Sequence, residues 1–563
     1  MARATLLGVL DRENPLRESI STCSASPPMD DESPSFPPIE PSNFDLIVVG
    51  TGLPESILAS AASAAGKTVL HLDPNPFYGS HSASLPIDDL VPFLKSQSEP
   101  QTLSQSQSEI AHGGDGVCIT LSTRPLYTDV EINAYSPDLV GLSRKFSLDL
   151  AGPRVFLCSD SMIDLILRTD VNQYMEFKSV EACFLSDAEG KLESVPDSRG
   201  AIFKSRTLSL PEKNQLMKFF KLVQGHVGSE SEENKISEED LGSPFVDFLT
   251  KMGLSEKLKS IILYTIVMAD YDQRNLEVCK EVMDTKSGIN GLALYHSSIG
   301  RFPNANGAII YPIYGQGELP QAFCRRAAVK GCIYVLRMPV VSVLMDKDGQ
   351  MHKGVKLASG QELFSSQLIL APHFTIPSTS APIEQVASSH NARLSDTEEK
   401  VARGICIAKN SVKPGVSNCM VFFPPKSLYP EQITTVRVLH LSGNVAACPS
   451  GMFVTYLSAK CGNAVEGKKL LNEAINTLFC KEHLCENTEG KPCLLWSALY
   501  IQELTEFRGA SQSITFTPMP DEHLHYNNLL DATKKLFQEI YPNEEFFPKI
   551  STTDDDFCDD GST

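Results

Sequence analysis

Hydrophobic positions near the start of the chain fall into short runs separated by polar turns. Residues 44–50 (FDLIVVG) form a short apolar run rich in β-branched residues, which is typical of a buried strand. Residues 56–66 (SILASAASAAG) are rich in alanine and end in glycine, which predicts a helix. Residues 68–73 (TVLHLD) predict a second strand. A strand, a helix and a strand in this order predict a parallel sheet within an α/β domain.

Helical spacing dominates the next part of the chain. Residues 161–177 begin with Ser161 as a helix cap and have apolar residues three or four positions apart. Residues 212–227 and 243–269 continue the helical character. We therefore expect a mainly helical domain inserted into the α/β domain.

Strand-like runs return further on. Residues 332–346, 354–360 and 366–372 are apolar runs separated by Gly and Asp turns, which predicts a meander beside the first sheet. Residues 528–542 predict a final helix. The expected fold class is therefore α/β, of the FAD/NAD(P)-binding type, with an inserted all-helical domain.

The ends of the chain and two inserts are polar. Residues 1–43 are rich in Ser and Pro and predict a disordered leader, in which Met29 offers a second possible start of translation. Residues 96–109 and 228–240 are interpreted as solvated surface loops. The expected boundaries are a leader at 1–43, a discontinuous α/β domain at 44–150 and 255–548, a helical domain at 151–254, and an acidic tail at 549–563.

Composition narrows the possible partners and the compartment. The formal net charge of −20 argues against nucleic acid as a partner, because phosphate contacts need a basic face. The fifteen cysteines are scattered, and Cys480 and Cys485 lack a second pair at zinc-site spacing, so we interpret them as thiols in a reducing compartment. No apolar run approaches the roughly 18–20 residues of a membrane span. Cys558 does not lie in a C-a-a-X box. We therefore expect a cytoplasmic protein that contacts membranes only indirectly.

The turn after the first predicted strand, residues 50–55 (GTGLPE), departs from a dinucleotide-binding turn. Such a turn has glycine at the position of Glu55, where the pyrophosphate meets the helix N-terminus. A negatively charged carboxylate at this position repels a diphosphate. Asp73 occupies the place of a ribose-binding carboxylate, but we favour its interpretation as a cap of the turn that follows. The fold is expected to persist without a cofactor.

Other catalytic or metal-binding patterns are missing from the sequence. It contains no G-x-S-x-G, P-loop or H-E-x-x-H motif, and its twelve histidines have no metal-ligand spacing. His71, inside an apolar strand, is interpreted as a core residue. The residues thus favour a binding protein over an enzyme.

Several segments together resemble the family of Rab GDP-dissociation inhibitors and Rab escort proteins. The similar segments, in family order, are residues 45–85, 126–140, 157–182, 311–340 and 534–548. Residues 315–321 (GQGELPQ) and 212–220 (EKNQLMKFF) resemble the escort branch more than the dissociation inhibitors.

This resemblance implies a non-catalytic accessory subunit. Its expected partners are GDP-bound Rab GTPases, the Rab geranylgeranyl transferase heterodimer, the geranylgeranyl lipid of a prenylated Rab and, transiently, a membrane. Two alternatives stay open: a dissociation inhibitor that binds only prenylated Rabs, and a flavin-dependent oxidoreductase of the amine-oxidase type.

The resemblance also implies where partners bind. Tyr78 and Gly79 belong to the expected Rab-binding platform, with Gln316 and Glu318 from the GQGELPQ segment. An exposed tyrosine suits an interface anchor. The alternative for Tyr78 is a turn residue packed on its own domain. The alternative for the GQGELPQ segment is an architectural turn before a helix.

The helical domain is expected to hold the lipid and to dock the transferase. The resemblance places transferase docking at Phe219, Phe220 and Leu222. It also implies a mobile loop at residues 245–253, with Phe248 and Met252 as contact candidates. The apolar residues between 162 and 167 are candidates for a lipid groove, although their spacing first predicts an ordinary core.

Overall fold

The computed structural model describes most of the chain from residue 37 to residue 548. The predicted acidic tail lies outside the described residues, as do most of the predicted leader and the central parts of both polar inserts. No helix within the described part is long and apolar enough to cross a membrane. The described residues are 37–98, 111–113, 116–139, 141–196, 198–228, 235–275, 279–305, 307–349, 351–376, 400–481, 490–504 and 513–548.

The predicted strand–helix–strand unit is confirmed. Strand β1 (Asn43–Val49), helix α1 (Leu53–Ala64) and strand β2 (Val69–Asp73) form it, and the two strands pair in parallel. The predicted leader is too long, because Ile39 is already buried and its backbone N–H donates to Gln361 Oε1 at 2.9 Å.

The first sheet combines a parallel part with the predicted meander. Strand β14 (Ile333–Leu336) pairs in parallel with β2, and β17 (Glu362–Leu370) pairs in parallel with β1 on its other side. The sheet then continues antiparallel from β17, so β14 belongs to the parallel edge and not to the meander. The order is β14-β2-β1-β17-β16-β15-β5-β4, with β16 His352–Leu357, β15 Val340–Met345, β5 Gly116–Thr120, β4 Ala111–Gly113, and β25 (Ile514–Phe516) beside β17.

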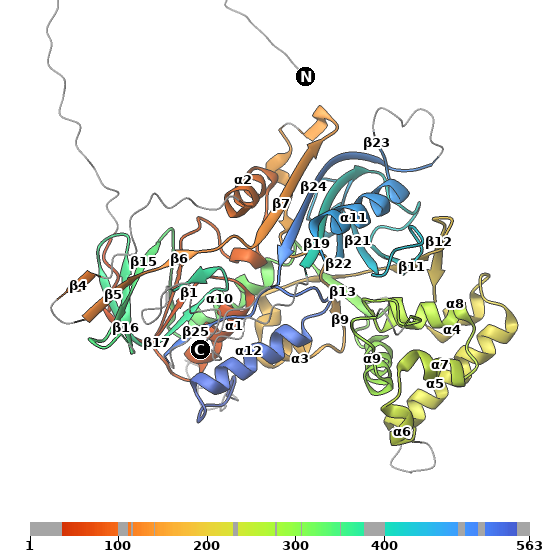
Figure 1. Cartoon of the computed structure of the whole chain (residues 1–563), viewed down its shortest axis with the longest axis horizontal. Helices are drawn as coiled ribbons and strands as arrows, with labels where there is room; N and C mark the ends of the chain where they lie inside the picture. Colours follow the sequence, from red (N-terminus) through yellow and green to blue (C-terminus); the bar gives the residue numbers. More distant parts are fainter. Residues whose placement is uncertain are drawn as a thin grey trace, which may run out of the picture. The chain divides into compact units, whose positions relative to one another are not determined.

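Four helices pack together over this sheet (Figure 1). They are α1, α3 (Ser161–Arg168), α10 (Glu318–Val329) and α12 (Asn527–Ile540), the last being the predicted final helix. Met162, Ile163, Leu165 and Ile166 of α3 are buried in their shared core, as their spacing predicts, whereas Leu167 is 41% exposed. The cap of α3 is Asp160 rather than Ser161, since its side chain accepts from the Met162 N–H.

The sequence does not predict a second sheet, which is antiparallel except where β11 pairs with β20 and β23 with β24. Helix α11 (Ala464–Leu478) packs against it. Its strand order is β12-β11-β20-β21-β22-β19-β24-β23, with β7 paired to β24. The bounds are β7 Tyr127–Ala134, β11 Ala182–Ser186, β12 Leu192–Val195, β19 Lys400–Lys409, β20 Cys419–Phe423, β21 Val436–Ser442, β22 Met452–Cys461, β23 Cys480–Lys481 and β24 Cys493–Glu503.

The inserted helices lie apart from the first sheet (Figure 1) and run from residue 199 to residue 298. This range begins and ends later than the expected 151–254, because residues 151–195 supply α3 and short strands instead. The helices are α4 Arg199–Lys204, α5 Leu210–Gly228, α6 Glu238–Leu241, α7 Phe245–Lys251, α8 Glu256–Ser260, a π-helix at Ile261–Ile266, and α9 Thr285–Ser298.

Smaller elements connect the larger ones. Helix α2 (Ile87–Ser98) packs near β7. Three short sheets complete the fold: β9 (Phe156–Leu157), β10 (Phe177–Ser179) and β13 (Ile309–Pro312); β3 (Ser84–Leu85) with β8 (Leu148–Asp149); and β6 (Ser122–Thr123) with β18 (Phe374–Thr375).

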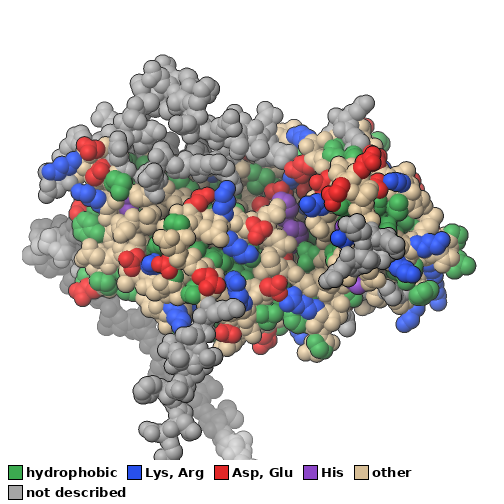
Figure 2. Space-filling view, turned by 90° about the horizontal axis from the view of Figure 1, so that it is seen from below, with side chains coloured by type: hydrophobic (Ala, Val, Ile, Leu, Met, Phe, Trp, Pro, Cys, Tyr) green, Lys and Arg blue, Asp and Glu red, His purple; other side chains and the backbone are tan. Residues whose placement is uncertain are grey.

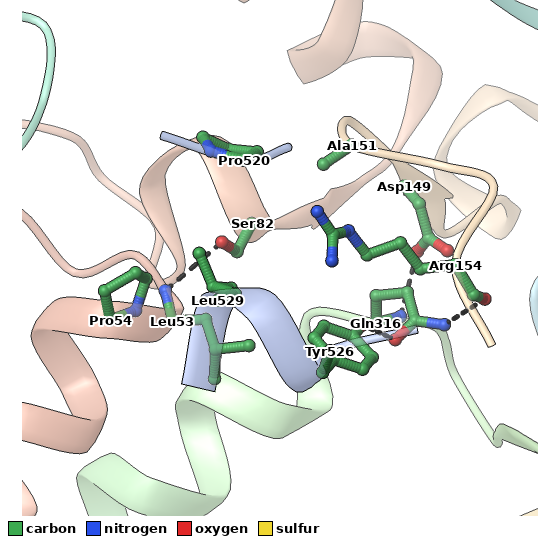
Figure 3. A pocket seen from close by; sticks show the side chains of 10 residues that line it. All are labelled: Leu53, Pro54, Ser82, Asp149, Ala151, Arg154, Gln316, Pro520, Tyr526 and Leu529. Carbon is green, nitrogen blue, oxygen red and sulfur yellow. Dashed lines mark hydrogen bonds between the residues drawn. The ribbon is translucent and has the colours of Figure 1, made fainter. Parts of the chain in front are cut away.

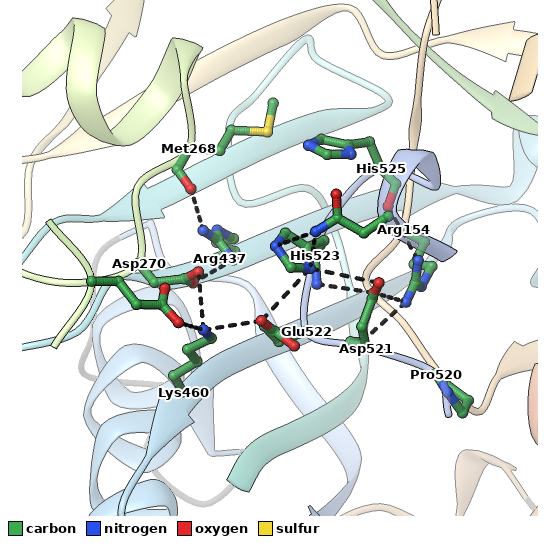
Figure 4. Close-up of polar contacts among 12 residues, drawn as sticks. Arg154, Met268, Asp270, Arg437, Lys460, Pro520, Asp521, Glu522, His523 and His525 are labelled. Carbon is green, nitrogen blue, oxygen red and sulfur yellow. Dashed lines mark hydrogen bonds and ion pairs between the residues drawn. The ribbon is translucent and has the colours of Figure 1, made fainter. Parts of the chain in front are cut away.

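A charged junction joins the segment after the π-helix to the second sheet (Figure 4). Asp270 pairs with Arg437 of β21 at 2.7 Å, and Lys460 of β22 pairs with Glu522 at 2.9 Å and with Glu281 at 2.6 Å. Because the Arg437 and Lys460 side chains are almost wholly buried, these partners are needed to offset the cost of burying their charge.

Candidate functional site

Glu55 fills the position where a dinucleotide phosphate would approach α1. Its side chain is buried, and Oε1 accepts a 2.5 Å hydrogen bond from Thr517 Oγ1. Oε2 has no hydrogen-bond partner among the described residues and lies over Gly52, 2.5 Å from where a Cβ on that residue would sit. Burial raises the pKa of Glu55 to about 7, with the Thr517 bond opposing the rise.

The surroundings of this turn do not fit a dinucleotide. The Leu53 N–H, at the start of α1, already donates to Ser82 Oγ at 3.2 Å. The neighbouring cavity (Figure 3), between Pro54, Arg154 and Tyr526, measures about 20 Å³, which is room for about one water molecule. A fold of the FAD/NAD(P)-binding type implies a diphosphate at this place. The Glu55 carboxyl group takes up that space instead.

Asp73 caps the next turn, as the sequence predicts. Thr51 Oγ1 donates to its Oδ2 at 2.6 Å, and the backbone and side-chain amides of Asn75 donate to its Oδ1 at 2.8 Å. His71 is buried, with Nε2 2.6 Å from the Gly50 carbonyl, and burial lowers its pKa to about 4. Its interpretation as a core residue is confirmed.

Tyr78 is half-buried and turns its hydroxyl inward. The hydroxyl lies 3.1 Å from Ser56 Oγ and 3.1 Å from His71 Nδ1. The ring contacts the half-exposed Tyr334, with ring centroids 6.1 Å apart. This geometry matches the alternative of a residue packed on its own domain, while part of the ring remains accessible.

Gly79 holds a turn that other residues would strain. Its φ is +110°, and a Cβ there would lie 2.9 Å from the Ala83 backbone. Its N–H donates to Thr51 Oγ1 at 2.9 Å. Gly79 therefore shapes the surface next to Tyr78 without offering a side chain.

The GQGELPQ segment lies against the same stretch of chain as Gly79. The Gly317 N–H donates to Ser84 Oγ at 2.7 Å, immediately after Ala83. Gln316 is buried: its Nε2 donates to the Arg154 carbonyl at 2.7 Å and its Oε1 accepts from the Tyr526 hydroxyl. Glu318 is half-buried at the start of α10, where burial raises its pKa and Arg325 opposes the rise. The structure thus brings the two halves of the expected platform together, with Gln316 in a supporting position.

Tyr314 is an exposed aromatic residue that the sequence reasoning missed. Its side chain is 58% exposed, and its φ of +72° is unusual for a bulky residue. The backbone is held there by a 2.8 Å bond from its N–H to the Val445 carbonyl and a 2.6 Å bond from Ser147 Oγ to its carbonyl. The only sequence signal is its place directly before the GQG turn.

The residues expected to dock the transferase lie on α5. Phe219 is buried, and its ring centroid is 6.5 Å from that of Phe248 on α7. Phe220 and Leu222 are half-buried and pack against the same core. Among the three, only Phe220 and Leu222 keep accessible surface.

The segment expected to be a mobile loop, residues 245–253, forms helix α7 and its C-terminal cap. Its first turn buries Phe245 and its second buries Phe248, because both side chains face the core of the inserted helices. Met252 is half-buried at the helix end. The expectation of a loop is therefore wrong for this segment.

Comparison with solved structures supports the fold. A Rab GDI from Plasmodium falciparum superimposes with a TM-score of 0.62 at 19% sequence identity, covering 90% of this chain and 99% of that one. At this identity the likeness concerns the fold alone.

Comparison of sequences identifies the family. The model of the family described as GDP dissociation inhibitor matches residues 40–110 and 107–484. Rab escort protein 1 of Arabidopsis thaliana is 51% identical, covering 93% of this chain and 98% of that protein. Rab proteins geranylgeranyltransferase component A of Drosophila melanogaster is 26% identical over 90% of each. The chain therefore belongs to the family of Rab escort proteins and Rab GDP-dissociation inhibitors.

Proposed function

We propose that this chain acts as a Rab escort protein. It binds unprenylated, GDP-bound Rab GTPases, presents them to Rab geranylgeranyl transferase, and delivers the prenylated product to membranes. The observation that carries this function is the 51% identity to an escort protein along nearly the whole of both chains. The chain is a non-catalytic accessory subunit, in line with the Drosophila relative named as component A of the transferase. It acts in the cytoplasm, with transient contact to membranes.

The physical need for such a carrier follows from the lipid. A geranylgeranyl chain has about twenty carbons, and each CH₂ removed from water contributes about 0.8 kcal/mol. A free prenylated GTPase would aggregate or insert into the nearest bilayer. A carrier that binds GDP-bound Rab more tightly than GTP-bound Rab releases its cargo when GTP replaces GDP.

We assign direct Rab contacts to Tyr78 and Glu318. Both side chains are half-buried and so keep surface for a partner. Gly79 and Gln316 fix the two turns that carry them, as their buried hydrogen bonds indicate. Tyr314 joins this group, because an exposed aromatic side chain buries much area at a low entropy cost.

We assign transferase docking to the accessible parts of Phe220 and Leu222 on α5. Phe219 anchors that helix in the core of the inserted helices, since its side chain is buried. Met252 at the end of α7 is a further contact candidate, with Phe248 as its buried support.

A binding experiment tests the proposal. Unprenylated Rab is loaded with GDP or with a non-hydrolysable GTP analogue and mixed with this chain, with and without the transferase, before size-exclusion chromatography. We expect co-elution with GDP-loaded Rab and a larger complex when the transferase is added. Binding that requires a prenylated Rab would instead make the chain a dissociation inhibitor.

The flavin-dependent alternative has its own readout. The position of the Glu55 carboxyl group over Gly52 disfavours it. An absorption spectrum of the purified protein with a flavin band would contradict that interpretation.

A further inference from the structure

The α4 and α5 helices meet at an exposed surface that is both apolar and basic. Phe203, at the end of α4, is 65% exposed, and Leu210, at the start of α5, is 72% exposed. Large apolar side chains at such exposure, next to several cations, are typical of contact surfaces. We call this the α4–α5 surface, and its residues are Phe203, Lys204, Arg206, Leu210, Lys213 and Lys257.

Hydrogen bonds hold the cations beside the apolar residues. Lys213 Nζ donates to the Phe203 carbonyl at 3.0 Å and to the Ser205 carbonyl at 2.6 Å. Lys257 Nζ donates to the Thr207 carbonyl at 3.0 Å. Two ammonium groups thus lie against the loop between the helices, in addition to the exposed Lys204 and Arg206 in that part of the chain.

Two acidic side chains also touch this region, and both have partners. Glu193 pairs with Lys257 at 2.6 Å. Glu212 accepts from the backbone and side chain of Ser209 at 2.9 and 2.8 Å, and from Ser255 Oγ at 2.9 Å. Among the described residues, the six cations of this surface and its extension along α5 (Lys204, Arg206, Lys213, Lys218, Lys221 and Lys257) outnumber these two acids.

The same surface continues along α5. Leu210, Asn214, Lys218 and Lys221 are all exposed and lie within a narrow arc, because steps of four, four and three residues return to one helix face. Figure 2 shows basic and hydrophobic side chains next to each other at the end of the molecule that carries these helices.

A basic surface of this kind stands out on a chain whose formal net charge is −20. Exposed apolar side chains flanked by Lys and Arg fit the interface of a bilayer with anionic headgroups, where the cations are attracted to the headgroups and the apolar groups enter the headgroup region. We propose that the α4–α5 surface binds the anionic phospholipid surface of a membrane, with Phe203 and Leu210 entering the bilayer interface.

This inference deepens the delivery step of the proposed escort function, but it needs no Rab. The test is co-sedimentation of the full chain with vesicles of phosphatidylcholine, with or without phosphatidylserine, at low and high salt. We expect binding that requires phosphatidylserine and weakens with salt. The F203S/L210S variant is expected to lose at least about tenfold in affinity, and K204E/R206E to lose the preference for phosphatidylserine.

A matched control uses exposed valines elsewhere. Val329 of α10 is 75% exposed and Val465 of α11 is 81% exposed, so V329S/V465S removes similar apolar surface away from the proposed contact and is expected to bind as the wild type does. A second readout is F203W, because the single tryptophan, Trp496, is buried in β24. Its emission is expected to shift to the blue on phosphatidylserine vesicles only.

Three outcomes would overturn the inference. The wild type could fail to bind phosphatidylserine vesicles at low salt, or F203S/L210S could bind them as the wild type does. In the third, F203S/L210S would lose its support of Rab prenylation in solution without vesicles, which would make this a protein-docking surface. Vesicle binding by a chain that does not support prenylation would overturn the escort function alone.

Discussion

At the scale of single residues, Glu55 best explains why this fold differs from a flavoenzyme. One carboxyl group sits where a diphosphate would lie, and a single side-chain hydroxyl, that of Thr517, donates to it. The departure from glycine was readable in the sequence because the turn is local. The tertiary partner of Glu55 was not, since Thr517 lies far away along the chain.

The pKa of Glu55 leads to a pH-dependent stability. Its folded pKa of about 7 lies above the ordinary value of 4.5, so the folded state binds the proton more tightly than the unfolded state. Below pH 4.5 Glu55 is protonated in both states and does not reduce the free energy of unfolding. As the pH rises to about 7, burial of the carboxyl group reduces that free energy by about 3 kcal/mol. We expect E55Q to unfold at higher denaturant concentration than the wild type at about pH 8, with the gain shrinking towards pH 4.

The exposed Glu362 on β17 provides the control for this measurement. E362Q is expected to track the wild type over the whole range. A gain for E55Q that does not depend on pH would contradict the assignment of a buried, titrating carboxyl group.

Tyr78 separates the role of a hydroxyl group from that of a ring. Because the hydroxyl faces Ser56 and His71, Y78F is expected to cost about 1 kcal/mol of unfolding free energy and to leave Rab affinity nearly unchanged. Y78A removes the accessible part of the ring and is expected to weaken Rab binding by about tenfold or more. Isothermal titration calorimetry with GDP-loaded Rab measures the affinity of both variants. An equal loss of Rab affinity in Y78F and Y78A would contradict the inward position of the hydroxyl.

At the scale of elements, local patterns could be predicted and long-range pairings could not. Strands β1 and β2 and helix α1 follow directly from their sequence runs. Strand β19 was missed because its run contains Lys400 and Arg403, whose partners Glu503 and Gln502 lie about a hundred residues further along the chain. The exposure of a side chain cannot be predicted from the local sequence either. Tertiary contacts decide that Tyr314 is accessible and that Phe248 is buried.

Helix α5 is the element expected to dock the transferase. L222D places a charge at a half-buried position on its docking side, so we expect it to reduce formation of the complex with the transferase while Rab binding persists. V465D on helix α11 is the control, because Val465 is 81% exposed and lies on a helix with no proposed transferase contact. Surface plasmon resonance with immobilised transferase distinguishes them, and equal binding of both variants would move the docking site elsewhere.

The charged junction after the π-helix gives a second pH-dependent prediction. Burial lowers the pKa of His523, but contacts with Asp521 and Glu522 outweigh it and hold the pKa above its usual value. Protonated His523 therefore stabilises the folded state fully below pH 6.5, and this stabilisation is lost as the pH rises through the pKa of His523 in the folded state. We expect H523Q to be less stable than the wild type in mild acid and equal to it in base.

His525 serves as a comparison of opposite sign. Burial lowers its pKa to about 4, so its protonation costs stability as the pH falls below 6.5. H525Q is therefore expected to gain stability relative to the wild type as the pH falls from 6.5 towards 4. Urea unfolding of both variants across this range tests the pair, and shifts of the same sign would contradict the account.

At the scale of the whole molecule, we propose that a fold of the FAD/NAD(P)-binding type carries surfaces for protein partners. The first sheet and its helices hold the proposed Rab contacts, and the inserted helices hold the proposed transferase contacts. The family could be recognised from motifs along the chain, because segments that resemble it recur from residue 45 to residue 548, and the family model matches most of this range.

The most direct test is prenylation of a purified, unmodified Rab by Rab geranylgeranyl transferase, with and without this chain. The account predicts that lipid transfer depends on the chain, requires GDP-loaded Rab, and falls with L222D but not with V465D. Transfer that is unchanged by the chain, together with extraction of already prenylated Rab from membranes, would contradict it and make the chain a dissociation inhibitor.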